Sequence, residues 1–472
     1  MRGILASSIG VTCAAALALP LAPPAAAVAG PAPTAEAATR ATGATGATDA
    51  DVPGSTQSLS LRPLGGDRAA GTVVQGLGPR TVRQFSLLGV VWDDPAAHLD
   101  GLVQVRTRSV ATGTWSGWQD VETHNADHAA DPGTPERASG TRRGATAPLW
   151  VGASDGVEIR VRATAAPATG SPDGTATGPA DGTRSAAVPL LPAGLQLELI
   201  DPGDGTPASA GPLDAPRAGE TGTEATAASA ANASLAPLGA TEIPALSREL
   251  TERELLSDRG AAAPGARQAK PYIGPRPAIT TRRGWGANES MREKGFSYTK
   301  KVKAAFVHHT ASGNTYKCSQ APSLIRGFYR YHVVSLGWRD IGYNFLIDKC
   351  GRIYEGRAGG VAKPVLGAHT LGFNSNSMGI AVIGSYGAKK PSGSAVKAVS
   401  RLTAWKLGLH GMNPKGKTYL TSAGGNLYRK GKKVRLNVIS GHRDGFNTAC
   451  PGGKLYKKLG SARSTAARYQ GR

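Results

Sequence analysis

Aromatic residues, cysteines and long apolar runs are all scarce in this chain of 472 residues. Aromatic residues make up only 6 %, whereas there are 63 glycines and 32 prolines. This composition excludes a chain that is folded throughout, because Gly/Pro-rich stretches cannot bury enough apolar surface to offset chain entropy. Beyond the first 29 residues no apolar stretch approaches the roughly 20 residues that span a bilayer, which excludes a transmembrane helix there.

The first 29 residues have the three parts of a secretory signal. Arg2 supplies the positive charge, Ile4 to Leu21 form the apolar run, and Ala27 to Ala29 are the small residues before a cleavage site. An N-terminal membrane anchor is the competing interpretation, but prolines at 20, 23 and 24 interrupt a run that is already short for spanning. We therefore expect cleavage after Ala29 and a secreted, extracellular protein that can keep a disulfide bond.

Only four cysteines occur, and Cys13 lies in the expected signal. The other three are an odd number, so one of them needs a role other than a disulfide. The simplest partition pairs Cys318 with Cys350 and leaves Cys450 as a thiolate metal ligand. A helix is predicted from Lys454 onward, and its N-terminus favours a thiolate at Cys450. A buried, inert thiol is the alternative.

Composition also sets the predicted domain boundaries. Tracts rich in Ala, Thr, Gly and Pro at 30–56, 164–188 and 203–240 indicate linkers or disordered loops. The predicted order is a signal peptide (1–29), a low-complexity linker (30–56), a β-rich domain (57–202), an Ala/Gly/Pro-rich linker (203–277) and an α/β domain (278–472).

The N-terminal and C-terminal parts of the chain differ strongly in net charge. From Pro271 onward there are 35 lysines and arginines against six acidic residues, whereas the preceding part has 20 against 27. A field of this size attracts polyanions in a salt-dependent way. The export signal argues against nucleic acid, so anionic wall polymers and carboxylate-bearing peptides are the expected partners. A basic surface that serves only solubility is the alternative.

The β-rich domain is expected to be an all-β sandwich or barrel. Its β-type segments are 81–92, 102–109, 157–163 and 195–200. Trp115 and Trp118 could stack on sugars, but buried strand aromatics are the favoured interpretation. His98, His124 and His128 lie in polar or acidic loops without ligand-like spacing, and no chemistry is assigned to them.

In the C-terminal part strands alternate with helices, which predicts a central mixed sheet flanked by helices. The predicted strands are 304–310, 341–348, 352–356, 378–384 and 438–441, and the predicted helices are 321–334, 395–409 and 454–468.

Three residues of this domain are of the kinds that hold a catalytic zinc ion. They are His308 in Val-His-His-Thr, and His442 and Cys450 in Gly-His-Arg-Asp-Gly-Phe-Asn-Thr-Ala-Cys. Three protein ligands with one open position are typical of a catalytic zinc site, whereas a structural site usually takes four. The sequence therefore predicts a Zn²⁺ metallohydrolase. Neighbouring residues of a strand point to opposite faces, so spacing alone does not decide between His308 and His309; we treat His309 as structural.

Several motifs follow one another in this domain, namely His-His-Thr, Asp340-Ile-Gly-Tyr-Asn-Phe, Tyr354-Glu-Gly-Arg, Gly367-Ala-His-Thr and the late His442 and Cys450 pair. With these motifs in this order, the chain from about residue 278 to 465 resembles the peptidoglycan recognition protein family, which is related to type 2 N-acetylmuramoyl-L-alanine amidases. The segment Arg282 to Ala287, with Trp285, looks like the family's domain opening. Cys318 and Cys350 are more widely spaced than the two cysteines of the common animal pattern.

The resemblance implies a role for each matching position. His308, His442 and Cys450 match the zinc ligands, Tyr343 matches the catalytic tyrosine, and Thr448 stands where catalytic members often have a threonine. His332, His369 and Asn374 match positions that contact the muramyl peptide. A core residue is the alternative for His332 and Tyr343, and a loop hydroxyl is the alternative for Thr448.

The resemblance thus implies a cell-wall-associated zinc enzyme that hydrolyses the amide between N-acetylmuramic acid and L-alanine of peptidoglycan. Tyr343 would donate to the developing oxyanion, and Thr448 would be a secondary polar contact. The alternatives are a peptidoglycan-binding module without catalysis and a structural wall protein. The sequence indicates neither the stem-peptide type, nor the oligomeric state, nor the general base.

Overall fold

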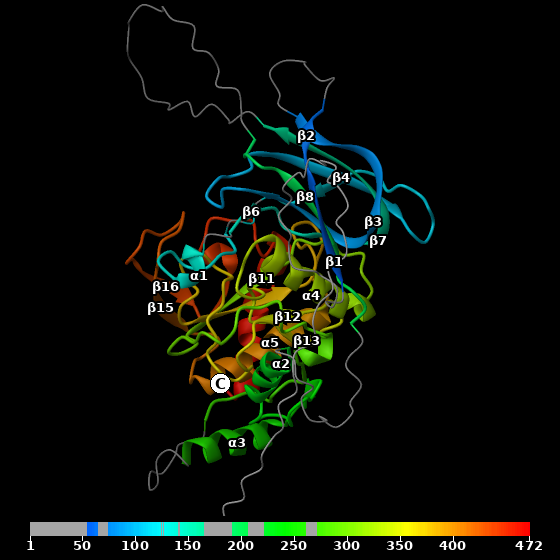
Figure 1. The fold of residues 1–472 in the computed structure, drawn as a ribbon. Coiled ribbons are helices and arrows are strands. Elements are labelled where there is room, and N and C mark those ends of the chain that lie inside the picture. Colours follow the sequence, from blue (N-terminus) through cyan, green and yellow to red (C-terminus); the bar gives the residue numbers. More distant parts are fainter. Residues whose placement is uncertain are drawn as a thin grey trace, which may run out of the picture. The chain divides into compact units, whose positions relative to one another are not determined.

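The computed structural model describes residues 54–64, 74–123, 125, 127–139, 142–164, 191–205, 221–260 and 271–472 (Figure 1). The expected signal peptide, Cys13, His124 and most of the tracts at 30–56 and 164–188 lie outside these residues. Among the described residues, no helix combines the length and apolar character that crossing a membrane requires.

The N-terminal part is one antiparallel sheet in the order β1-β8-β3-β7-β4-β5, with β2 and β6 also paired to β3. Its strands are β1 (Ser55–Ser60), β2 (Arg62–Pro63), β3 (Val74–Trp92), β4 (Gly101–Ser109), β5 (Gln119–Val121), β6 (Gly144–Ala145), β7 (Leu149–Ala163) and β8 (Gln196–Asp201). The all-β prediction is confirmed, but these strands share one hydrogen-bonded sheet rather than forming two separate sheets. The register between β3 and β7 shifts at three places, which is how a long strand pair can bend.

The C-terminal part contains the predicted mixed sheet, in the order β17-β11-β14-β12-β13-β10-β9. Its strands are β9 (Glu242–Ile243), β10 (Ile279–Thr280), β11 (Ala304–His309), β12 (Phe345–Ile347), β13 (Ile353–Glu355), β14 (Ser377–Val382) and β17 (Ile439–Gly441). Strand β11 lies between β14 and β17 and is parallel to both. A separate hairpin, β15 (Lys417–Thr421) and β16 (Lys433–Asn437), was not predicted.

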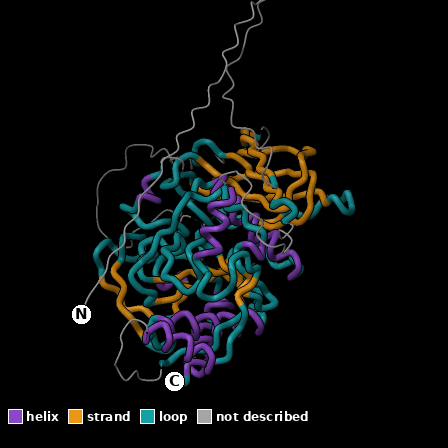
Figure 2. The backbone as a smooth tube through the Cα atoms, turned by 60° about the horizontal axis from the view of Figure 1, so that its bottom comes forward, coloured by secondary structure: helices purple, strands orange, loops and turns teal. Residues whose placement is uncertain are grey.

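Helices cover both faces of the C-terminal sheet (Figures 1 and 2). On one face α5 (Gly393–Leu409) and α7 (Leu459–Gln470), preceded by the short α6 (Gly453–Tyr456), bury the side chains of alternate strand residues such as Phe345 and Ile380. On the other face α4 (Ala321–Arg330) continues into a π-helical turn, η3 (Tyr331–Ser335).

The β-rich part shares a core with the face that α4 covers. Leu87, Trp150 and Ile200 of the N-terminal sheet belong to the same apolar cluster as Phe328 and Leu346. Polar contacts reinforce it, since the Tyr331 hydroxyl donates to the Thr146 carbonyl oxygen at 3.0 Å. The N-terminal sheet therefore packs on α4 and η3 of the C-terminal domain, and the two parts share one core instead of being separate modules on a linker.

The prediction of a linker at 203–277 is wrong for residues 221–260. This segment contains α2 (Thr221–Ala230), β9 and α3 (Arg248–Gly260), and β9 extends the mixed sheet by pairing with β10. The Asn232 side chain donates to both carboxylate oxygens of Glu355 at 3.0 Å. Tertiary pairing thus overrides the Ala/Gly-rich composition that indicated a linker.

The expectation that Trp115 and Trp118 are buried is also wrong. Trp115 is 36 % exposed and Trp118 is half-buried. The Arg106 guanidinium lies 5.5 Å and 5.3 Å from the two ring centroids, and the Arg160 guanidinium lies 4.1 Å from that of Trp118. The two rings lie on the sheet surface, where they make cation–π contacts with arginines instead of being buried.

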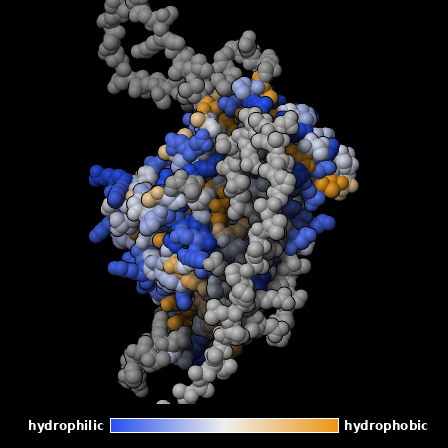
Figure 3. Space-filling view, in the orientation of Figure 1, coloured by the Kyte–Doolittle hydropathy of each residue, from blue (hydrophilic) through white to orange (hydrophobic). Residues whose placement is uncertain are grey.

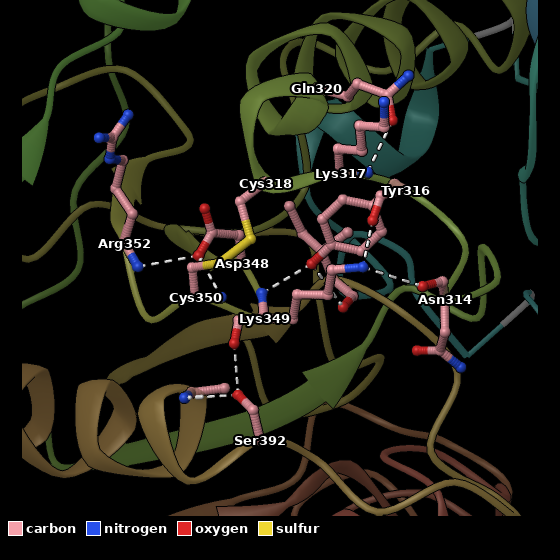
Figure 4. Close-up of a disulfide and its surroundings, with 12 residues drawn as sticks. Asn314, Tyr316, Lys317, Cys318, Gln320, Asp348, Lys349, Cys350, Arg352 and Ser392 are labelled. Carbon is pink, nitrogen blue, oxygen red and sulfur yellow. Dashed lines mark hydrogen bonds between the residues drawn. A yellow bond between two sulfur atoms is a disulfide. The ribbon is translucent and has the colours of Figure 1, made fainter.

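The predicted disulfide between Cys318 and Cys350 is present (Figure 4). It ties η2 (Cys318–Gln320), which leads into α4, to the turn between β12 and β13. The Asp348 carboxylate shapes that turn by accepting from the backbone N–H of Cys350 and Arg352, both at 2.9 Å.

Replacing both cysteines with serine is expected to lower the free energy of unfolding by roughly 3 kcal/mol, because the bond closes a loop across a sequence separation of 32 residues. Urea unfolding of the double variant beside the oxidised protein measures this. The oxidised protein after reduction serves as the matched control and should unfold like the variant. Equal midpoints for oxidised and double-serine protein would contradict the prediction.

Candidate metal centre

Four buried side chains bring one ligand atom each to a common point, namely His128, His308, His442 and Cys450. All four atoms lie within 4.8 Å of one another. His308 Nδ1 is 3.2 Å from His128 Nε2 and 3.8 Å from Cys450 Sγ, and the sulfur is 3.9 Å from His128 Nε2. The three predicted ligands therefore meet, and a fourth joins them from the N-terminal part.

The strand β11 decides between the two adjacent histidines. Ala305 and Val307 point into the core beneath α5 and α7, so His309, in the same alternation, points to that side. His309 Nδ1 accepts the Tyr386 backbone N–H at 3.2 Å, which fits the structural role expected for it. His308 points to the opposite face, where the other three ligand atoms lie.

The distances fit a tetrahedral zinc ion. With Zn–N near 2.0–2.1 Å and Zn–S near 2.3 Å, the edges of the tetrahedron are about 3.3 Å between nitrogens and about 3.6 Å between nitrogen and sulfur. Within the described part of the chain, neither ring nitrogen of His442 has a hydrogen-bond partner, although the residue is fully buried. His442 Nδ1 has Asp127 Oδ2 nearby at 3.7 Å, which is too long for a hydrogen bond. Buried nitrogens without a hydrogen bond are costly unless they bind a ligand, so these residues fit a zinc ion.

A histidine binds a metal ion through a neutral imidazole ring, and His308 and His442 meet this condition. Burial, followed by the neighbouring histidines, lowers the pKa of His308 well below its usual value. Burial likewise lowers the pKa of His442 to about 3, against the opposing effect of Asp127. Both side chains are therefore neutral at pH 7 and present lone pairs to a cation.

Cys450 differs from expectation. The helix that follows it, α6, has only four residues, and burial raises the pKa of the Cys450 thiol well above its usual value, with a further contribution from Asp127. The helix N-terminus that was expected to favour the thiolate is therefore only a single short turn. A bound cation would have to stabilise the thiolate, as zinc does for its thiolate ligands.

Side chains behind the ligands fix their orientation. The far nitrogen of His308, Nε2, lies 3.3 Å from His369 Nδ1 and 3.4 Å from Thr370 Oγ1. Asn374 Oδ1 accepts the backbone N–H groups of His369 and Thr370, at 2.7 Å and 3.0 Å. His369 is fully buried and supports a metal ligand, so contact of His369 and Asn374 with substrate stays a prediction.

The remaining predicted site residues lie around the ligands. The Tyr343 ring centroid is 5.6 Å from that of His308 and 5.8 Å from that of His332. His332 stacks on Trp338, and its Nδ1 accepts the Gly342 N–H at 3.2 Å. Thr448 is half-buried, and its hydroxyl accepts the Cys450 N–H at 3.2 Å.

His128 is the residue that sequence reasoning missed. It lies between β5 and β6, and its Nδ1 is 2.8 Å from Asp127 Oδ1, the carboxylate–histidine pairing common at zinc sites. Burial alone would raise the pKa of Asp127, but His128 and His442 hold it below its usual range. The adjacent Asp and His were the only local signal, because nothing in the spacing links this loop to ligands 180 or more residues away.

The centre is closed to solvent. His308 and His442 are fully buried, and Tyr343 is 5 % exposed. The cavity that touches His128, Tyr343, Thr448 and Cys450 has a volume of about 20 Å³. This is room for about one water molecule and not for a sugar or peptide.

The mixed sheet and the buried histidine–cysteine centre beside it are those of an amidase-type domain. The family described as N-acetylmuramoyl-L-alanine amidase matches residues 298–453, and the family described as Rv3811 N-terminal galactose-binding domain-like matches residues 35–182. The second match agrees with the all-β character of the N-terminal part.

Individual relatives have also been found by sequence and by structure comparison. Peptidoglycan-recognition protein 1 of Holotrichia diomphalia is 32 % identical over 184 residues, which are 39 % of this chain and 79 % of that protein. Peptidoglycan-recognition protein SC2 of Drosophila simulans is 28 % identical over 181 residues, 38 % and 84 % of the two chains. The solved structure of wild-type Drosophila PGRP-LB has 26 % identity over 39 % of this chain and 92 % of its own, with a TM-score of 0.31. The chain belongs to the peptidoglycan-recognition protein family.

Proposed function

We propose that the C-terminal domain hydrolyses the amide between N-acetylmuramic acid and the L-alanine of peptidoglycan stem peptides in a zinc-dependent reaction. The observation that carries the proposal is the meeting of His308, His442 and Cys450 beside Tyr343 at distances that fit zinc. When bound, zinc would supply a water of lowered pKa and polarise the amide carbonyl.

The chain's own residues would position and stabilise the reacting groups. Burial, with smaller contributions from Cys450 and Asp127, raises the pKa of Tyr343 well above its usual value, so its hydroxyl stays protonated and can donate to a developing oxyanion. His369 and Thr370 hold the His308 ring, and Thr448 adds a hydroxyl at the edge of the cavity.

Peptidoglycan incubated with the protein, with and without a chelator, tests the proposal. New N-terminal alanine that appears without chelator and stops with it supports the amidase. Binding to peptidoglycan without release supports a recognition module instead, which is the second candidate. The closed set of four protein ligands favours this second candidate, because four ligands are usual in structural zinc sites.

Replacing Tyr343 with phenylalanine is expected to lower the turnover of amide hydrolysis by on the order of 10²- to 10³-fold, because one oxyanion donor is lost. The zinc content should stay unchanged, since the tyrosine is not among the four ligand residues. Tyr386→Phe is a matched control, as Tyr386 donates to the Ile383 carbonyl away from the ligands. Unaltered turnover in Tyr343→Phe would assign the tyrosine to the core.

The β15–β16 hairpin supports binding to anionic wall polymers. Residues 410–437 contain no acidic residue, and seven exposed basic side chains lie there: Lys415, Lys417, Arg429, Lys430, Lys432, Lys433 and Arg435. Hydrophilic side chains project from this side of the molecule in Figure 3. Secretion, our proposal for its location, fits both such a partner and the disulfide.

A further inference from the structure

The connection between β5 and β6 lies over the metal centre. It runs from residue 122 to 143, and the one regular element in its described residues is the four-residue helix α1 (Pro135–Ala138). Connections of this length with so little regular structure are uncommon in compact domains and are often functional. We call residues 127–139 the occluding segment.

The occluding segment reaches the metal centre through His128. Its Nε2 lies 3.2 Å from His308 Nδ1 and 3.9 Å from Cys450 Sγ, and its ring centroid is 4.6 Å from that of His442. Because three protein ligands leave one corner of a tetrahedron free, His128 occupies the corner that a catalytic site keeps for solvent or substrate.

Two carboxylates of the occluding segment, Asp131 and Glu136, bind polar groups of the C-terminal domain. Asp131 Oδ1 accepts from the Asn374 side chain at 2.7 Å and from the Gly372 N–H at 2.8 Å. Glu136 forms a two-pronged ion pair with Arg357, at 2.8 Å and 2.9 Å, and both side chains are 6 % exposed. A carboxylate-bearing ligand of this face would have to compete with these contacts.

The contacts that keep the occluding segment in place are mostly polar. Of residues 127–139, only Ala130 belongs to the apolar core that the two sheets share. Segments with few apolar contacts open at lower free energy than the core around them. Opening the segment would therefore break buried polar contacts, including those of Asp131 and Glu136, but would leave the shared apolar core almost intact.

We propose that residues 127–139 are an autoinhibitory segment that closes the C-terminal domain by supplying His128 as a fourth metal ligand. Opening exchanges the His128 imidazole for solvent and breaks the Asp131 and Glu136 contacts, with no covalent change. The proposal rests on the proposed zinc site but not on hydrolysis. It differs from a permanent structural zinc site in requiring that the fourth position can be vacated.

The test compares the full chain with His128→Gln, a substitution of similar volume, and with the double variant Asp131→Asn/Glu136→Gln. His98→Gln is the matched control, because His98 is an exposed histidine of the same domain. The first readout is the visible spectrum of the Co²⁺-loaded protein with and without thiocyanate. The second is the rate of zinc loss to a chelator, and the third is release of N-terminal alanine from peptidoglycan.

We expect thiocyanate to change the spectrum of His128→Gln and not that of the full chain or His98→Gln. Zinc loss from His128→Gln should be at least ~10-fold faster than from the full chain. The double variant, which keeps all four ligand residues, should lose zinc faster than the full chain by a smaller factor, and it tests the proposal even if His128→Gln does not fold. Both variants should release alanine at least ~10-fold faster than the full chain.

The two proposals fail in different ways. Changed cobalt spectra and faster zinc loss without alanine release from any protein would support closure of the metal centre by residues 127–139 and would defeat the amidase. A full chain that responds to thiocyanate and releases alanine as fast as its variants would overturn the autoinhibitory segment and leave the amidase standing. Spectra, zinc loss and alanine release that are unaltered in both variants would also overturn it.

Discussion

Replacing Cys450 with serine is expected to abolish zinc retention and amide hydrolysis together. A serine hydroxyl is a much poorer ligand than a thiolate at neutral pH, and Cys450 supplies the one sulfur of the centre. The metal contributes several kcal/mol to such reactions, so turnover should fall by about 10³-fold or more. Metal analysis after dialysis and an assay of alanine release measure the two effects.

If residues 127–139 close the metal centre, the turnover of the full chain is low before any ligand is changed. The effect of Cys450→Ser should therefore also be measured in a protein with an open centre. Cys450→Ser is best compared with the unaltered residue both in the full chain and in His128→Gln, where the centre is expected to be open. Thr448→Val is a suitable control for metal content, because Thr448 lies two residues away and is not a ligand. A Cys450→Ser protein that keeps zinc and full turnover would contradict the whole account of the site.

The sequence predicted the C-terminal fold well because its elements are locally determined. The strands at β11, β13 and β14 and the helix α5 begin and end within two residues of their predicted limits. Their buried residues alternate or recur with the helical period, so pattern and tertiary packing agree. The motifs around His308, His442 and Cys450 also predicted that these residues meet, and the structure brings them together.

The parts that escaped prediction depend on contacts between distant segments. His128 is 180 residues from His308, and only the packing of two sheets on a common core brings the two rings together. In the same way β9, a two-residue strand in an Ala/Gly-rich tract, forms because β10 offers it an edge. Composition and periodicity describe each segment alone, and neither carries information on such pairings.

The second large effect is expected at Arg282, in the segment that resembles the family's domain opening. This guanidinium is 2 % exposed and donates to Glu289 at 2.7 Å and 3.1 Å and to Asp340 at 3.0 Å. Coulombic attraction to Asp340 and Glu289 outweighs burial and raises the pKa of Arg282 well above its usual value. Arg282→Met should therefore lower the free energy of unfolding by about 3–5 kcal/mol, because it leaves two carboxylates buried and less well paired.

Urea unfolding at pH 7 measures this effect, with Arg108→Met as the control. Arg108 pairs with Asp155 on the surface, where both side chains are partly exposed, so its loss should destabilise the protein far less than the loss of Arg282. A loss below 1 kcal/mol for Arg282→Met would mean that water enters the network.

The same network fixes the turn that precedes Tyr343. Asp340 accepts the Ile341 N–H at 2.7 Å and the Ala358 N–H at 2.8 Å, and these contacts hold the turn that leads to Tyr343. A folded Arg282→Met protein should for this reason lose turnover while keeping its zinc, because the metal ligands come from other strands and loops. Stability and the proposed hydrolysis should therefore both depend on the buried Arg282 side chain, which is not among the candidate metal ligands.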